Sequence, residues 1–412
     1  MFRSLRVRNY RLYAAGQLVS LTGTWMQRVA QDWLVLELTN SGTALGIVTA
    51  LQFGPSLFFG LWGGVIADRG DKRKILFATQ GSLALAALVL GVLDVAGVVR
   101  FWHVLVLATL LGLIAAVDTP VRQSFVVEMV GRKDLVNAVG INSTIFNAAR
   151  ILGPAVAGVM ITAVGTGWAF LVNALSSMAV LAGLWLMRPS ELYPAPPLVR
   201  AKGQLRDGFL YVRGRADLML TMVLVFIVGT FGLNFQITTA LIAKQVFHRG
   251  ASGYGLLSTT LAVGACAGAV LATRRRDRPT QLFLVVAALG FAVLEIGAGV
   301  MPSYGLTALL LVPTGLAMLT LTTAANSSVQ LGVEPTMRGR VMALYLVCFM
   351  GGTPLGAPIV GWLAGTAGAR WGLIGGGLIC LVATLAIAAT IAHRRGLRPA
   401  YLAERAAMAT HA

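Results

Sequence analysis

The chain has 412 residues, of which 57% are hydrophobic and only 12% charged, and its mean hydropathy is +0.78. A soluble domain could not bury that much apolar surface, so the composition predicts an integral membrane protein. The net charge is +18, but the basic residues recur between apolar stretches and never form one stripe, which argues against a nucleic-acid-binding surface.

Twelve apolar stretches, each long enough to cross a bilayer, follow one another along the chain. Lipid offers no hydrogen-bond partner to an exposed backbone, so each stretch is predicted to be a helix. The expected fold is therefore all-α, with twelve transmembrane helices. The predicted spans are residues 11–38, 43–67, 75–97, 103–127, 138–163, 166–187, 218–242, 253–273, 280–300, 304–331, 339–365 and 369–392.

Lysine and arginine concentrate in every second connection between these spans. Such alternation is the positive-inside pattern, which predicts a multi-pass protein of the cell (inner) membrane with both termini in the cytoplasm. The basic clusters are Arg3 to Arg11, Arg69 to Lys74, Arg132 with Lys133, Arg188 to Arg215, Arg274 to Arg278, Arg338 with Arg340, and Arg394 to Arg405.

The two halves of the chain look duplicated. Gln123 and Gln330 each end a span, and Pro154 and Pro358 each lie inside the next one, at offsets of 207 and 204 residues. A repeat at half the chain length, with six spans in each half, predicts two parallel bundles related by an axis along the membrane normal. The predicted parts are an N-terminal bundle (1–188), a cytoplasmic linker (189–217) and a C-terminal bundle with a short tail (218–412). Residues Gln204 to Val212 of the linker are expected to form a short amphipathic helix.

Two segments resemble motifs of the major facilitator superfamily, and the resemblance covers essentially the whole chain. Residues 64–73 resemble the loop motif between its second and third helices, and span five resembles its antiporter motif. Residues 118–125 and 33–36 resemble the subgroup that contains the bacterial enterobactin exporter. The resemblance implies an exporter that is not an enzyme, but the arginine usual in the middle of span four of drug–proton antiporters is absent. The residues it assigns to conformational change are Gly64, Asp68, Arg69, Arg73, Gly153, Pro154 and Gly158. Gly356 and Pro358 are expected to bend span eleven and to pack it closely at the interface between the halves.

Nothing in the sequence indicates covalent catalysis, a metal site or a cofactor. No glycine-rich loop ends in Lys-Ser or Lys-Thr, so ATP is not expected to drive the chain directly. The three cysteines have no metal-ligand spacing. The expected partners are a small-molecule substrate, protons and the lipid bilayer, and the expected state is a monomer.

Polar groups at membrane depth are costly, so they are the candidates for function. Span one holds Gln27, Arg28, Gln31 and Asp32, and Arg28 and Asp32 are four residues apart, where they could pair along the helix. One hypothesis is that Asp32 takes up a proton and frees Arg28 for an anionic substrate. The alternative is a permanent structural ion pair.

Three further charged groups are candidates. Asp118 lies four residues before Arg122, and Arg150 lies midway along the next span. These three residues form either a charge triad that joins two helices or a site in which Arg150 meets the substrate and Asp118 a proton. Glu295 stands alone in span nine, where it is either a second proton site or simply hydrated.

The remaining cavity candidates are uncharged. Amides and aromatic rings at membrane depth either bind a ligand or join helices, and the sequence leaves both readings open. These residues are Phe146, Asn147, Asn234, Gln236 and Asn326.

The predicted function is secondary transport by alternating access, and specifically proton-coupled export of small amphipathic molecules that are drug-like or siderophore-like. Two alternatives remain: an importer or uniporter of the same fold, and a membrane scaffold or sensor that transports nothing.

Overall fold

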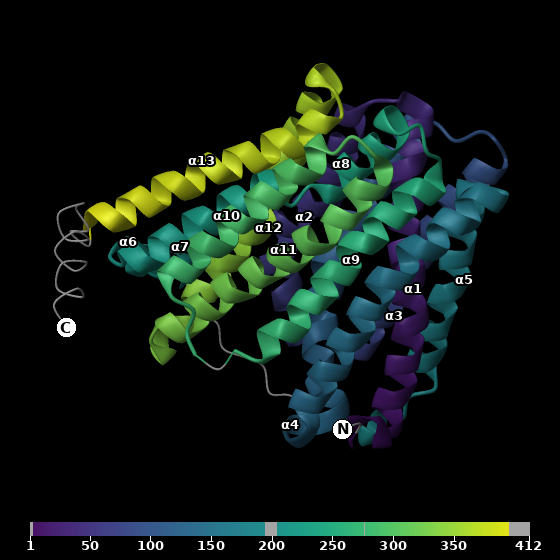
Figure 1. The fold of residues 1–412 in the computed structure, drawn as a ribbon. Coiled ribbons are helices and arrows are strands. Elements are labelled where there is room, and N and C mark those ends of the chain that lie inside the picture. Colours follow the sequence, from purple (N-terminus) through teal and green to yellow (C-terminus); the bar gives the residue numbers. More distant parts are fainter. Residues whose placement is uncertain (1–2, 194–203, 276, 395–412) are drawn as a thin grey trace.

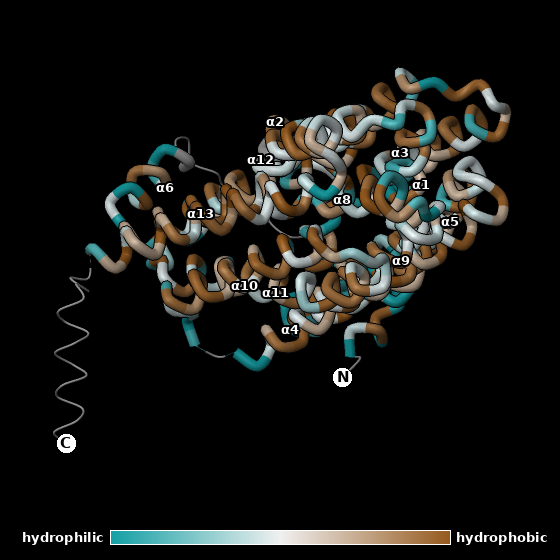
Figure 2. The backbone as a smooth tube through the Cα atoms, turned by 45° about the horizontal axis from the view of Figure 1, so that its top comes forward, coloured by the Kyte–Doolittle hydropathy of each residue, from teal (hydrophilic) through white to brown (hydrophobic). Residues whose placement is uncertain are grey.

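The computed structural model describes residues 3–193, 204–275 and 277–394, and these ranges are helical without any strand. Ten of their helices are long and apolar enough to cross a membrane. Figure 2 shows hydrophobic residues along the helices and hydrophilic residues gathered at many of their ends. The prediction of an all-α membrane fold is confirmed.

The helices fall into two groups by their position in the chain. The N-terminal group comprises η1 (Arg3–Arg6), α1 (Arg8–Thr39), α2 (Gly42–Arg69), α3 (Lys72–Val95), α4 (Phe101–Val164) and α5 (Thr166–Trp185). Two short helices follow, η2 (Pro189–Glu191) and α6 (Gln204–Arg213). The C-terminal group comprises α7 (Ala216–Ile227), η3 (Val228–Gly232), α8 (Phe235–Leu241), η4 (Ile242–Val246), α9 (Ala251–Thr273), α10 (Gln281–Val300), α11 (Tyr304–Gly332), α12 (Pro335–Ala367) and α13 (Arg370–Arg394).

The sequence predicts two spans joined by a charged loop where the structure has the single helix α4. Its 64 residues are interrupted only at Gly131, where the backbone adopts φ 68°. Glycine tolerates this left-handed conformation, so one residue suffices to redirect the chain. Helix α1, which is rich in polar residues, is not among the ten apolar helices. Twelve crossings require α1 and two passes of α4, so that number stays a prediction.

The seventh span is broken, although the sequence predicts one continuous helix over 218–242. Helix α7 passes into the π-helical turn η3, and Leu233 and Asn234 then leave helical geometry before α8 begins. The break contains Gly229, Gly232 and Asn234, three residues of low helix propensity. The prediction of an unbroken span was therefore wrong.

The two groups meet mainly toward one end of the molecule. We call this the far end; it carries the turns at Asn40 and at residues 247–250, whereas the terminal end carries η1. In Figure 1 the groups lie close together at the top and diverge downward, with α6 and α7 on the left and the labelled part of α4 at the bottom, near the N-terminus. Across the groups, α2 packs on α12 and the second part of α4 packs on α9.

Small residues allow these crossings. A Cβ atom on Gly361 of α12 would lie 2.2 Å from the carbonyl oxygen of Gly42, and one on Gly46 would lie 2.4 Å from that of Ala357. On α9, a Cβ on Gly255 would lie 2.5 Å from the carbonyl oxygen of Pro154. The structure thus places the Pro154 and Pro358 regions at the contact between the groups.

Gly64, Asp68, Arg69 and Arg73 lie around the turn between α2 and α3, at the terminal end. Arg73 donates hydrogen bonds to the carbonyl oxygens of Leu184 (2.7 Å) and Trp185 (2.9 Å), so it caps the last turn of α5. Asp71 accepts from the backbone N–H of Lys74 (3.1 Å) and starts α3. The turn thereby ties three helices together.

Helix α6 occupies the place where the sequence predicts an amphipathic helix. It packs on α12, and Asp207 forms an ion pair of 3.2 Å with Arg340. Residues 194–203 of the predicted linker and 395–412 of the predicted tail lie outside the described residues. The division into two bundles with a linker stays a proposal.

Candidate substrate cavity

A cavity of about 490 Å³ lies among α1 to α5, and its wall comes from the N-terminal group except for Met350 of α12. The wall mixes apolar, aromatic, amide, hydroxyl and charged side chains. It consists of Tyr13, Gln17, Ser20, Leu21, Thr24, Trp25, Gln27, Arg28, Gln52, Phe53, Ser56, Gln80, Leu83, Leu111, Ala115, Asp118, Thr119, Arg122, Gln123, Val126, Asn142, Ile145, Phe146, Asn173, Ser177 and Met350.

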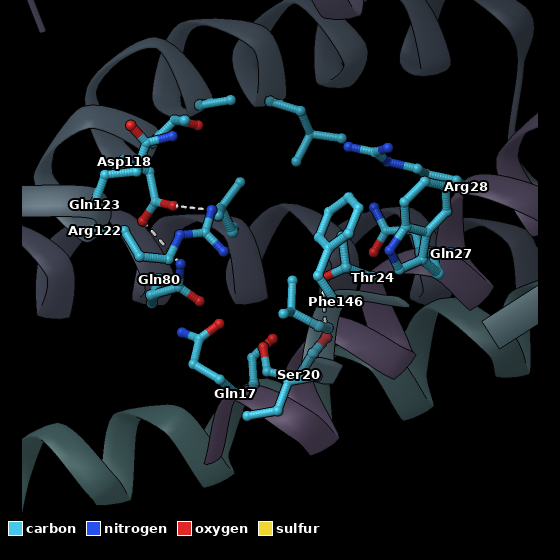
Figure 3. A pocket seen from close by; sticks show the side chains of 18 of the residues that line it. Gln17, Ser20, Thr24, Gln27, Arg28, Gln80, Asp118, Arg122, Gln123 and Phe146 are labelled. Atoms are coloured by element: carbon cyan, nitrogen blue, oxygen red, sulfur yellow. Dashed lines mark hydrogen bonds and ion pairs between the residues drawn. The ribbon is translucent and has the colours of Figure 1, made fainter. Parts of the chain in front are cut away.

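One side of the cavity carries a saturated charge network. Asp118 is 1% exposed and forms an ion pair of 2.5 Å with Arg122 on the next turn of α4. Its other oxygen accepts from Thr79 Oγ1 (2.7 Å) and Gln80 Nε2 (2.8 Å) of α3. Figure 3 shows this network on the left of the cavity, across from Arg28. Asp118 therefore binds α3 to α4 and holds Arg122 in place.

The opposite side carries a cation among aromatic rings. The guanidinium carbon of Arg28 lies 4.7 Å from the ring centroid of Trp25 and 5.7 Å from that of Phe53. Phe146 packs edge-on against Trp25 at 5.7 Å. Within the described residues Arg28 forms no ion pair, and its guanidinium lies against π faces in the cavity wall, where it can meet a ligand.

Arg150 is part of neither the network nor the wall. Of the two alternatives for Asp118, Arg122 and Arg150, the structure does not form the charge triad, because the Arg150 guanidinium lies over the ring of Trp25, 5.9 Å from its centroid. In the described part of the chain, it too forms no ion pair. Two arginines thus flank one indole ring, which places two cations near the contact between α1 and the second part of α4.

Asp32 also differs from its predicted pairing with Arg28. It is 5% exposed, and its Oδ2 accepts a hydrogen bond of 2.7 Å from the hydroxyl of Tyr254 in α9. Arg28 and Asp32 form no ion pair among the described residues. A hydroxyl from the other helix group has taken the place of the neighbouring arginine, so Asp32 joins the two groups.

Further contacts surround this bond at the far end. The ring of Trp33 stacks on Tyr254 with 6.4 Å between the centroids. The ammonium of Lys244 donates to the carbonyl oxygen of Leu36 (2.5 Å) and lies 5.9 Å from the centroid of Trp33. These contacts close the far end above the cavity.

The other predicted site residues are dispersed. Gln27 lines the cavity and accepts from Asn173, whereas Gln31 is buried outside the wall. Asn147 is half-buried and donates a hydrogen bond to the carbonyl oxygen of Ser143 in its own helix (2.8 Å). The C-terminal group's candidates, Asn234, Gln236, Glu295 and Asn326, do not line this cavity.

Several residues of the cavity wall were not predicted from the sequence, namely Ser20, Thr24, Gln52, Ser56, Gln80 and Thr119. Gln52 and Ser56 are four residues apart in span two, which is the helical spacing of a polar stripe. That spacing could have predicted that both residues face the cavity. No sequence pattern marks Gln80 as a wall residue, because a single amide in an apolar helix more often contacts a neighbouring helix.

Solved structures of other transporters share the fold of this chain. A bacterial homolog of the human lysosomal transporter Spinster, in an inward-facing and unoccupied conformation, superposes with a TM-score of 0.74 at 17% identity, covering 92% of this chain and 96% of that one. The nucleoside transporter NupG superposes with a TM-score of 0.74 at 13% identity, covering 94% and 99%. These superpositions cover nearly the whole chain, so the fold is shared over its full length.

The family model of the transmembrane secretion effectors matches residues 1–407, so the chain belongs to this family of major facilitator transporters. It is therefore a multi-pass membrane transporter and not an enzyme.

Curated relatives include the staphyloferrin A transporter of Staphylococcus aureus, 30% identical over 59% of this chain and 61% of that protein. The enterobactin exporter EntS of Shigella flexneri is 24% identical, covering 86% and 84%. The macrolide efflux protein A of Streptococcus pyogenes is 21% identical, covering 93% and 96%.

Proposed function

We propose that the chain exports small, amphipathic, oxygen-rich molecules from the cytoplasm in exchange for protons. The observation that carries this proposal is the wall of the cavity. Arg28 lies there without an ion pair to any described residue, beside the rings of Trp25, Phe53 and Phe146. A ligand with an apolar body and a carboxylate or a dense set of oxygens matches both features.

The direction of transport rests on sequence and relatives together. The positive-inside pattern orients the terminal end to the cytoplasm, so the far-end contacts close the outer side and the cavity belongs to an inward-facing state. Two of the relatives are named for export or efflux, of enterobactin and of macrolides. We take the cavity to load its substrate from the cytoplasm.

We assign proton coupling to Asp32. Closure of the outer end buries this carboxyl group against Tyr254. Burial of a neutral acid costs less free energy than burial of a carboxylate, so a proton taken up from outside favours closure. The proton then leaves toward the cytoplasm, and substrate loads beside Arg28. Protons and substrate thereby alternate in one cycle.

The test is uptake into everted membrane vesicles that pump protons inward. Wild type is compared with Asp32→Asn and Arg28→Gln, and Asp277→Asn, an exposed loop carboxylate, is the control. Three probes are used: a carboxylate-bearing amphiphile, its neutral ester and a lipophilic cation.

We expect gradient-driven uptake of the carboxylate probe by wild type and Asp277→Asn, and its loss in Asp32→Asn. Arg28→Gln should weaken the apparent affinity for the carboxylate probe about 10- to 100-fold. This corresponds to the loss of ~1.5–3 kcal/mol for a hydrogen bond to a charged group. Uptake of the neutral ester should be the same in Arg28→Gln as in wild type. Gradient-driven uptake that survives in Asp32→Asn would remove Asp32 from coupling. Uptake only in right-side-out vesicles would establish an importer instead.

A further inference from the structure

Two buried oxygen atoms stand out in the C-terminal group, away from the cavity. Among the described residues, the buried side-chain nitrogen and oxygen atoms without a hydrogen-bond partner are Asn234 Oδ1 and Glu295 Oε2. The two residues are 4% and 1% exposed. Buried polar atoms without partners are costly, so a pair of acceptors left open in the apolar core calls for a ligand.

The two residues that carry these atoms lie near one backbone carbonyl, that of Phe231, where the broken seventh span meets α10 and α13. A Cβ atom on Gly376 of α13 would lie 2.6 Å from the carbonyl oxygen of Phe231 and 3.3 Å from Glu295 Oε1. The amide of Asn234 lies against the same carbonyl, with Nδ2 3.4 Å from its oxygen. The glycine therefore permits a close approach of α13 to the place where a backbone carbonyl, a carboxylate and an amide lie near one another.

The backbone at this place is irregular. Leu233 and Asn234 depart from helical angles, and the N–H of Leu233 reaches back five residues to the carbonyl of Val228 (3.1 Å). At membrane depth, non-helical backbone is tolerated where it is buried in protein or lines a site, and the carbonyls of broken helices coordinate small cations.

No basic side chain balances Glu295 in the described residues. It forms no ion pair there, and the titratable group that faces it from α13 is the thiol of Cys380. The charged residues of the broken span, Asp217 and Lys244, lie near its two ends, and α11 carries no Asp, Glu, Lys, Arg or His. On α12 the charged residues Arg338 and Arg340 lie at the terminal end, and Tyr345 and Cys348 are its nearer titratable groups.

We propose that Glu295, Asn234 and the Phe231 carbonyl form a second site, which binds a small monovalent cation, either a proton or Na⁺. All three groups offer oxygen, the ligand atom that hard cations prefer. A cation cancels the cost of a lone buried carboxylate and gives the open oxygens a partner.

The site is placed to influence the contact between the helix groups. Helix α12 packs directly on the break, since a Cβ on Gly356 would lie 1.5 Å from the carbonyl oxygen of Thr230. Five residues further along α12, Gly361 contacts Gly42 across the groups. Occupancy of the site therefore favours one geometry of the break and, through α12, one state of the far end. This coupling role rests on the proposed transport cycle, whereas cation binding does not.

Infrared difference spectroscopy of the purified full-length protein in lipid nanodiscs tests the site directly. Wild type, Glu295→Gln and the control Asp277→Asn are each titrated with pH, with NaCl and with choline chloride. A protonated carboxyl group has a carbonyl band that a carboxylate lacks. We expect wild type and Asp277→Asn to share a band that is missing in Glu295→Gln.

The two cations give different results. For a proton site, the band changes with pH and is the same in sodium and choline. For a sodium site, the band is lost at constant pH when sodium replaces choline, and Asn234→Ala weakens that response. Identical spectra of wild type and Glu295→Gln in all series would overturn the proposal.

The vesicle assay separates this inference from the proposed function. If wild type transports with a gradient and Glu295→Gln keeps the same dependence on protons and sodium, the coupling role of the site is refuted while export stands. If wild type shows no gradient dependence but the Glu295 band responds to cations, the proposed exchange is wrong and the site remains.

Discussion

The hydroxyl of Tyr254 donates a hydrogen bond of 2.7 Å to Oδ2 of Asp32, and the two residues lie 222 positions apart in the chain. The bond joins α1 to α9 and lies where the two helix groups meet. Both side chains are almost fully buried, so the bond is protected from competition by water. It is the best candidate for a link between protonation and closure.

Removal of this hydroxyl should weaken the contact between the two helix groups. Tyr254→Phe leaves the Asp32 oxygen without its donor, which is expected to cost ~1–3 kcal/mol. Thermal unfolding in detergent of Tyr254→Phe, Asp32→Asn and the double variant measures the effect, and Tyr193→Phe, an exposed tyrosine, is the control. We expect the two changes to be coupled by about 0.5–3 kcal/mol. Additive effects would mean that the bond does not hold the groups together.

The glycine contact between α2 and α12 should control closure of the far end. Gly361→Ala places a methyl group 2.2 Å from the carbonyl oxygen of Gly42, so the helices must separate. Gly365→Ala is the matched control one turn further along, where the new atom meets only Thr43 Oγ1 at 3.8 Å.

Opening of the far end can be measured by thiol labelling of a cysteine introduced in the cavity wall, Thr24→Cys. The background protein lacks Cys266, Cys348 and Cys380. An impermeant reagent is applied from the far-end side. We expect Gly361→Ala to raise the labelling rate about tenfold for each ~1.4 kcal/mol lost from the closed contact. Equal rates for the alanine variants at 361 and 365 would contradict a gate at this crossing.

Asp118 is expected to be structural rather than a proton carrier. Asp118→Ala removes the partner of Arg122 and two hydrogen bonds from α3, and breaking a buried pair costs on the order of 3 kcal/mol. Partial exposure of Arg122 should reduce this figure. Thermal unfolding and the yield of folded protein are the measurements, with Asp277→Ala as control. Normal stability together with lost proton dependence would instead make Asp118 a coupling residue.

Arg73 should act through the shape of its side chain. Arg73→Lys keeps the charge but cannot donate to both Leu184 and Trp185 in the same way. We expect a loss of about 1 kcal/mol in the stability of the N-terminal group. Hydrogen exchange at the last turn of α5 measures it, and Arg11→Lys, an exposed site, is the control. Unchanged exchange would show that the two hydrogen bonds contribute nothing.

Much of the fold follows from the sequence because hydropathy and charge act locally. A run of apolar residues must be helical in lipid whatever its neighbours are, so the spans and the motif turn at residues 64–73 were predictable. The single-residue bend at Gly131 and the break at Asn234 were not, since a glycine or asparagine is compatible with both a straight and a broken helix until its neighbours pack.

The sequence by itself determined that this protein crosses a membrane repeatedly, and it named a few polar groups at membrane depth as candidates for its function. Only the tertiary structure decided which of these groups meet. Asp32 lies four residues from Arg28 but bonds to Tyr254, Arg150 lies over Trp25 rather than beside Asp118, and Glu295 faces a broken helix. Spacing along one helix names only the possible partners on that helix, whereas the packing of other helices decides which buried polar atom lies within hydrogen-bond reach.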